Sequence, residues 1–155
     1  MKIFKIFAII VMVMCLAWAA YSQEIERAAT IMDITGGASV KLSESEGWVT
    51  AEEGMILNQG NSVKTGPGSW VLLNVDGSAE TAMVEINEDS ELCLSELMKD
   101  DAKGTKKTLL DLAIGEIMIT VEKIQDPKSK FEVRTPTSTV GVRGTKFAVQ
   151  VNTLD

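Results

Sequence analysis

The chain has 155 residues, of which 15 are basic and 22 acidic, with a net charge of −7 and no histidine. This length suits one domain rather than two, and the acidic balance disfavours nucleic-acid binding, which needs a basic face for phosphate contacts. The missing histidine excludes the serine and cysteine triads that use histidine as the base, so we expect no catalytic residues, and no cofactor or metal site either.

The first 22 residues have the pattern of a signal peptide. Two lysines precede an uncharged run from Ile6 to Ala20, and small residues lead to a cleavage point before Gln23. The run has 15 residues, whereas a helix that crosses a bilayer needs about 20. We therefore prefer a cleaved signal helix to a retained anchor. Cys15 follows Met14 rather than a small residue, which disfavours lipidation.

Residues 23–155 are expected to form one all-β domain, periplasmic or secreted, with 13 basic and 22 acidic residues and a net charge of −9. Short apolar runs alternate with glycine-bearing turns, and no stretch of 12 or more residues has helical periodicity. The predicted strands, in chain order, are Thr30–Ile34, Ala38–Leu42, Trp70–Val75, Met83–Ile86, Glu91–Leu94, Lys107–Leu112, Ile117–Val121 and Phe147–Val151.

Turn and loop residues separate these strands. Asp76-Gly77-Ser78 is a strong hairpin signal, and Thr65–Ser69, with two glycines around a proline, predicts a compact loop. The polar segment Met98–Lys107 predicts an exposed loop, and Glu122–Lys130 predicts a second one.

Two similar segments, Gly54–Leu57 and Gly115–Met118, hint at an internal repeat. A repeat of short strands favours a β-solenoid-like stack, in which each coil buries its apolar side against the next. The alternative is a small β-sandwich.

Three side chains have two interpretations each. Trp48 and Trp70 are expected to pack in or beside the core, but either would be a ligand contact if it were exposed in a groove. Cys93 is the only thiol beyond residue 22, so it has no intramolecular disulfide partner. Because it alternates with Leu92 and Leu94 along a strand, we expect a small, partly buried thiol rather than a redox site.

The C-terminal part of the sequence resembles the FecR domains. Val133–Pro136 is a strand ending in Thr-Pro, Val140–Thr145 ends in Val-Arg-Gly-Thr, and Phe147 supplies the aromatic of the following strand. Upstream, the glycine-bearing turns of residues 54–66 and 69–78 are similar to the family's earlier hairpins, so the resemblance runs from about residue 28 to 151. The signature residues are Thr135, Pro136, Val142, Arg143, Gly144, Thr145 and Phe147.

The chemistry of this signature favours a structural corner. Pro136 removes a backbone donor and ends a strand, and Gly144 permits backbone angles that other residues resist. Arg143 has five donors that could tie a turn to carbonyls or a carboxylate. A ligand contact is the alternative role.

The resemblance implies a β-solenoid-like extracytoplasmic domain that contacts other proteins. In the namesake group such domains sit on a membrane-anchored regulator, which relays an outer-membrane iron-transport signal to a cytoplasmic sigma factor. Only five residues precede the apolar run here, so we expect no sigma-binding segment.

We therefore predict a non-catalytic protein-interaction or structural module of the cell envelope, linked to envelope signalling. Its partner is an unidentified envelope protein, and it contacts the membrane only through the leader, if that stays uncleaved. The alternative is a module that binds cell-wall glycan or another carbohydrate.

Overall fold

The computed structural model describes residues 24–75, 82–122, 124, 126–144 and 146–152. All regular secondary structure in these ranges is β-strand, which confirms the all-β prediction. The predicted signal helix of residues 1–22 and the hairpin turn at residues 76–78 lie outside the described residues. In the part of the chain that is described, no helix has the length and apolar character needed to cross a membrane.

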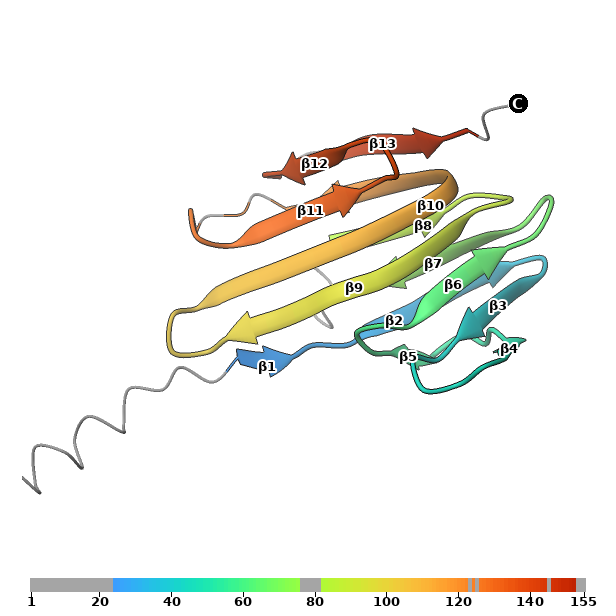
Figure 1. Ribbon diagram of the computed structural model, residues 1–155, viewed down its shortest axis with the longest axis horizontal. Helices are drawn as coiled ribbons and strands as arrows, with labels where there is room; N and C mark the ends of the chain where they lie inside the picture. Colours follow the sequence, from blue (N-terminus) through green and yellow to red (C-terminus); the bar gives the residue numbers. More distant parts are fainter. Residues whose placement is uncertain (1–23, 76–81, 123, 125, 145, 153–155) are drawn as a thin grey trace, which may run out of the picture.

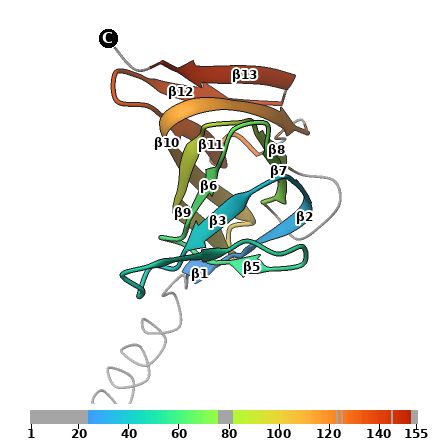
Figure 2. The same cartoon turned by 90° about the vertical axis from the view of Figure 1, so that its right-hand side faces the viewer.

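Within the described ranges, thirteen strands pair into one sheet that curls around its own core (Figures 1 and 2). The first seven are β1 (Glu24–Glu26), β2 (Ala29–Thr35), β3 (Ala38–Lys41), β4 (Trp48–Thr50), β5 (Ile56–Leu57), β6 (Ser62–Thr65) and β7 (Trp70–Asn74). The others are β8 (Ala82–Ile86), β9 (Glu91–Asp100), β10 (Thr105–Val121), β11 (Lys130–Arg134), β12 (Thr139–Val142) and β13 (Lys146–Val151).

The strand order is β4-β3-β6-β9-β10-β8-β7-β2-β5, with β1 on β9, β11 and β13 on β10, and β12 on β11. Among the described pairs only β10 and β11 run parallel. The predicted stack of solenoid coils is not confirmed, because the strands form hairpin-like antiparallel pairs in a continuous sheet. The architecture is an open, curled half-barrel, whose strands stay hydrogen-bonded through the bend instead of separating into two sandwich layers.

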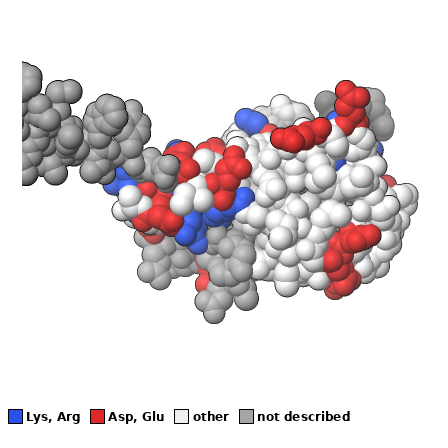
Figure 3. All heavy atoms as spheres, turned by 90° about the horizontal axis from the view of Figure 1, so that it is seen from below, with Lys and Arg blue, Asp and Glu red and all other residues white. Residues whose placement is uncertain are grey.

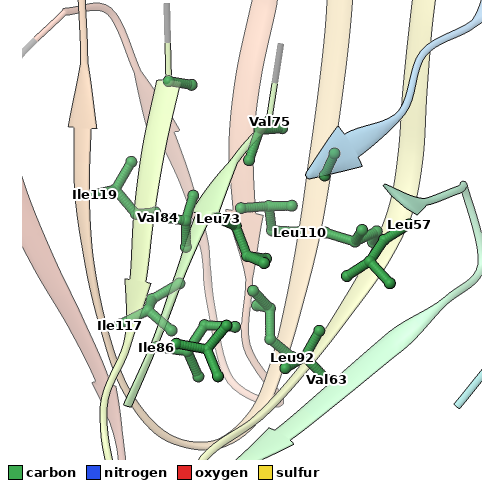
Figure 4. Packing of buried hydrophobic residues seen from close by; sticks show 14 of the residues in the cluster. Leu57, Val63, Leu73, Val75, Val84, Ile86, Leu92, Leu110, Ile117 and Ile119 are labelled. Atoms are coloured by element: carbon green, nitrogen blue, oxygen red, sulfur yellow. The ribbon is translucent and has the colours of Figure 1, made fainter. Parts of the chain in front are cut away.

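Period-two alternation builds the core. Ile117, Ile119 and Val121 point inward from β10 and are at most 6% exposed. Fully burying such a side chain contributes about 1.5–3 kcal/mol. Side chains from different strands meet in this single interior (Figure 4), among them Leu57, Val63, Leu73, Val84, Ile86, Leu92 and Leu110.

The 17-residue strand β10 turns the sheet through its main corner. Its first half pairs with β9 and β11, and its second half with β8 and β13. Between the halves lies Gly115, with a φ of +94°. The hydroxyl of Ser90 accepts a hydrogen bond from the Glu116 amide at 2.9 Å, which fixes the corner against the β8–β9 turn.

Each strand predicted from alternation is present, and two of them, Lys107–Leu112 and Ile117–Val121, are the halves of β10. Alternation does not predict the short strands β1, β4, β5, β6 and β12, because two to four residues are too few to show a period.

The prediction of an exposed loop over Met98–Lys107 is wrong at both ends. Strand β9 continues to Asp100 and β10 begins at Thr105, so only residues 101–104 form a turn. The charged ends of β9 and β10 lack apolar alternation, but backbone pairing stabilises them, because β9 pairs with β10 along one edge and with β1 along the other. An ion pair of 2.7 Å between Lys107 and Glu24 links β10 to β1. The second predicted loop is confirmed, because β10 ends at Val121 and β11 begins at Lys130.

Candidate functional site

The outer face of the sheet from β4 to β11 carries a row of side chains that the strand register aligns. The adjacent row contains Val40, Val63 and Leu92, all fully buried. Since neighbouring residues of a strand point to opposite faces, the aligned row faces outward. It consists of Trp48, Lys41, Ser62, Cys93, Asp111 and Arg134.

Asp111 and Arg134 form the tightest polar contact in this row. Arg134 donates from Nε to Oδ1 of Asp111 at 2.6 Å and from Nη2 to Oδ2, and the Ser95 hydroxyl also donates to Oδ2. Partial burial by itself raises the pKa of Asp111, but the hydrogen bonds from Arg134 and Ser95 and the charge of Arg134 outweigh it and hold the pKa below its ordinary value. The same hydrogen bond and charge raise the pKa of Arg134. This bidentate pair clamps the parallel β11 onto β10.

We expect Asp111→Asn to lower the free energy of unfolding by about 1 kcal/mol at pH 7, because a partly exposed, charge-assisted pair is lost. The folded-state pKa is lowered, so the carboxylate stabilises the fold above the ordinary pKa of an aspartate and loses this effect as the pH falls through the folded pKa. The difference from the wild type should therefore stay constant from pH 7 to about pH 5 and shrink below pH 4. Urea denaturation across this range tests it. A difference that is unchanged at pH 3 would contradict the assignment.

A hollow of about 250 Å³ lies beside this pair. Two signature residues, Thr135 and Pro136, line it together with Cys93, Asp111 and Arg134. The Thr135 hydroxyl accepts a hydrogen bond from the Ser138 amide at 3.0 Å, and the Thr135 amide donates to the Ser138 carbonyl at 2.7 Å, so these residues form the turn between β11 and β12. Cys93 is half-buried between the buried Leu92 and Leu94.

The other signature residues are dispersed. Val142 is buried at the end of β12, and Phe147 on β13 is half-buried and packs against the core. Gly144 has a φ of +91°, which favours glycine. Arg143 is exposed and forms no hydrogen bond or ion pair with the described residues, so the expected tie to a carbonyl or carboxylate is not seen there. Thr145 lies outside the described residues.

The two tryptophans occupy different parts of the surface. Trp48 on the edge strand β4 is 40% exposed, with the Lys64 ammonium 5.9 Å from its ring centroid. Trp48 is therefore not a core residue. Trp70 on β7 is half-buried and lines a second hollow of about 650 Å³.

That second hollow lies where the β6–β7 turn, the β8–β9 turn, the β10 corner and the end of β13 meet. Its polar lining includes Asn87, Glu88, Glu116 and Gln150. The Asn87 amide group donates to the Glu116 carboxylate at 3.0 Å, and the Glu88 carboxylate accepts from the Gly68 amide at 2.7 Å. The described residues contain no group of three acidic or cysteine side chains that could hold a metal ion.

Comparison with known proteins identifies the relationship. The sequence profile of the FecR protein family matches residues 61–155, which is more than half of the chain. The chain belongs to the FecR family. This family is non-enzymatic and is associated with envelope signalling, in which it acts with partner proteins. No curated protein and no solved structure matches the chain.

The FecR match covers part of what the sequence resemblance predicts. It includes β6 to β13, and so takes in the Asp111–Arg134 pair, both hollows and the signature from Thr135 to Phe147. Strands β1 to β5 lie before it, although the resemblance is expected from about residue 28.

Two structural residues escape prediction from the sequence. Arg27, between β1 and β2, donates to the Met98 carbonyl at 3.1 Å, the Lys107 carbonyl at 3.0 Å and the Thr108 hydroxyl at 2.5 Å. Asp111 meets Arg134 only through the register of β10 and β11. These three partners of Arg27 are 71 to 81 positions away, so no local pattern marks it.

Proposed function

We propose that this FecR-family chain is an exported, non-catalytic module of the cell envelope that binds another protein. Its membership of a family that acts with envelope partners carries the proposal. The free strand edges of the curled sheet support it, since unpaired backbone groups at an edge can pair with a strand of another chain.

The leader pattern of residues 1–22 supports export, and export implies a periplasmic or secreted location. The signature residues then have a structural role within the module. Val142 and Phe147 anchor the last two strands to the core, and Gly144 permits the turn between them. This arrangement leaves binding to surfaces outside the signature.

A tagged chain, cross-linked in the envelope of its native host, tests the proposal. We expect one protein to be recovered in stoichiometric amount. A tagged, unrelated exported domain serves as the control and should not recover that protein. Failure to recover any stoichiometric partner under several growth conditions would count against a protein-binding role.

The glycan-binding alternative is favoured by one observation, the position of Trp70 in the larger hollow beside the amide side chains of Asn87, Gln150 and Asn152. Aromatic faces with amide donors are suited to sugar rings. In that case peptidoglycan fragments would change the tryptophan fluorescence of the wild type but not that of Trp70→Phe. Unchanged emission of the wild type would reject this alternative.

A further inference from the structure

The exposed apolar side chains gather in one short part of the chain. Of the seven large hydrophobic side chains that the described residues expose, five lie between positions 32 and 56. We call them the edge patch: Leu42 and Trp48 (each 40% exposed), Val49 (44%), Met32 (50%) and Ile56 (62%). Single exposed apolar residues are ordinary, but a cluster usually marks an interaction surface.

The sheet topology explains why these side chains lie at the ends of the sheet. β4 and β5 are the two ends of the main strand order, and the segment 51–55 joins them. This segment crosses the gap between the ends, because the Ala51 amide donates to the Ala38 carbonyl at 3.0 Å and the Gly54 amide to the Ile31 carbonyl at 2.8 Å. A bulge in β2, where the register skips Met32, turns that side chain outward.

Both end strands lie on the lower side of the molecule in Figure 1, and the view from below in Figure 3 shows a wide surface without charged groups, bordered by both acidic and basic groups. The edge patch therefore places exposed apolar side chains at the two ends of the main strand order, with Trp48 and Val49 on opposite faces of β4.

Apart from its length of only three residues, strand β4 lacks the usual protection of an edge. Natural edge strands carry lysine, proline or inward-pointing charge, which prevents pairing with other chains. β4 consists of Trp48, Val49 and Thr50, all exposed, and pairs only with β3. These aromatic and β-branched residues favour strand pairing. An unprotected edge with exposed apolar side chains is suited to a partner strand.

The charges around the edge patch indicate the chemistry of the partner. From position 32 to 56 the exposed charged residues are five acids and one lysine: Asp33, Lys41, Glu44, Glu46, Glu52 and Glu53. A second copy would bring the same acids against each other, and anionic lipid would be repelled as well. The nearby Lys64 is already matched by Glu91 at 3.9 Å. The complementary partner is apolar and basic.

We propose that the edge patch binds an extended, apolar and basic segment of a partner protein, which adds to β4 as an extra strand. The inference rests on the proposed protein-binding function and deepens it. Trp48 is the anchor, since exposed tryptophans at interfaces contribute disproportionately to affinity. The edge patch lies before residue 61, so it belongs to the part of the chain outside the FecR match.

Amide chemical shifts of the isotope-labelled full chain test the inference, with a nine-residue peptide of alternating valine and lysine as the probe. We expect saturating shifts in β4 and β5, and weaker binding at high salt because the attraction is partly ionic. Trp48→Ser should lower the affinity at least tenfold. Val140→Ser removes a side chain that is 38% exposed on β12, away from the edge patch, and should leave the affinity unchanged.

Four results would overturn the inference: no shifts, shifts confined to other strands, equal binding of a peptide with glutamate in place of lysine, or a Trp48-dependent association with itself or with anionic vesicles. The capture experiment separates this surface from the proposed function. If Trp48→Ser still recovers the envelope partner in full, the surface is wrong and the function stands. If no partner is recovered but the probe binds β4, the function fails and the surface stands.

Discussion

Gly115→Ala is expected to lower the free energy of unfolding by about 4 kcal/mol or more, a cost at the upper end for a single substitution. An added Cβ would lie 2.5 Å from the Cα of Ser90, which is backbone and cannot rotate away. The φ of +94° adds conformational strain for any side chain. Both effects act at the corner of β10, so the two halves of the sheet could no longer keep their register.

Urea denaturation followed by circular dichroism measures this cost. Gly141→Ala is the matched control, because a Cβ at Gly141 meets no atom within 4 Å and its backbone needs no positive φ. Its effect should stay below about 1 kcal/mol. Adding Ser90→Gly to Gly115→Ala should recover little of the loss, because the clash with the Cα of residue 90 and the backbone strain remain, and the hydroxyl that accepts from the Glu116 amide is lost. Equal stability of the two alanine variants would refute the close packing at the corner.

The second large effect is expected at Arg27, where Arg27→Ala should lower the free energy of unfolding by about 3 kcal/mol. The guanidinium group holds carbonyls of β9 and β10 and the hydroxyl of Thr108, which is only 5% exposed. Removing it leaves these acceptors without their charged donor. Arg27→Lys should recover less than half of the loss, because an ammonium group cannot reproduce the planar fork.

Chemical denaturation and amide hydrogen exchange together test this role. Exchange should accelerate most in β1 and the facing part of β9, which Arg27 holds in place. Arg143→Ala is the control, since Arg143 is exposed and forms no polar contact with the described residues. It should change stability by less than about 0.5 kcal/mol. If the two variants are equally stable, Arg27 is not a structural clamp.

Local patterns identified the strands wherever a strand has one buried face. Ile117, Ile119 and Val121 alternate with more polar neighbours, and this period can be recognised because every second side chain is buried in the core. The same logic fails between Met98 and Lys107, where the β9–β10 ribbon is stabilised by backbone pairing with β1 rather than by burial. The edge strand β4 is also missed, since its three residues are all exposed.

The amino-acid sequence by itself determined the all-β class, most strand positions and membership of the FecR family, because alternation and short motifs are properties of neighbouring residues. Tertiary structure alone decided how the sheet curls at Gly115, which acceptors Arg27 reaches, and that Asp111 faces Arg134. It also decided that Trp48 lies outside the core, on an edge strand of the sheet. These features depend on register and bending between strands far apart in the chain, and a period of two residues carries no information about either.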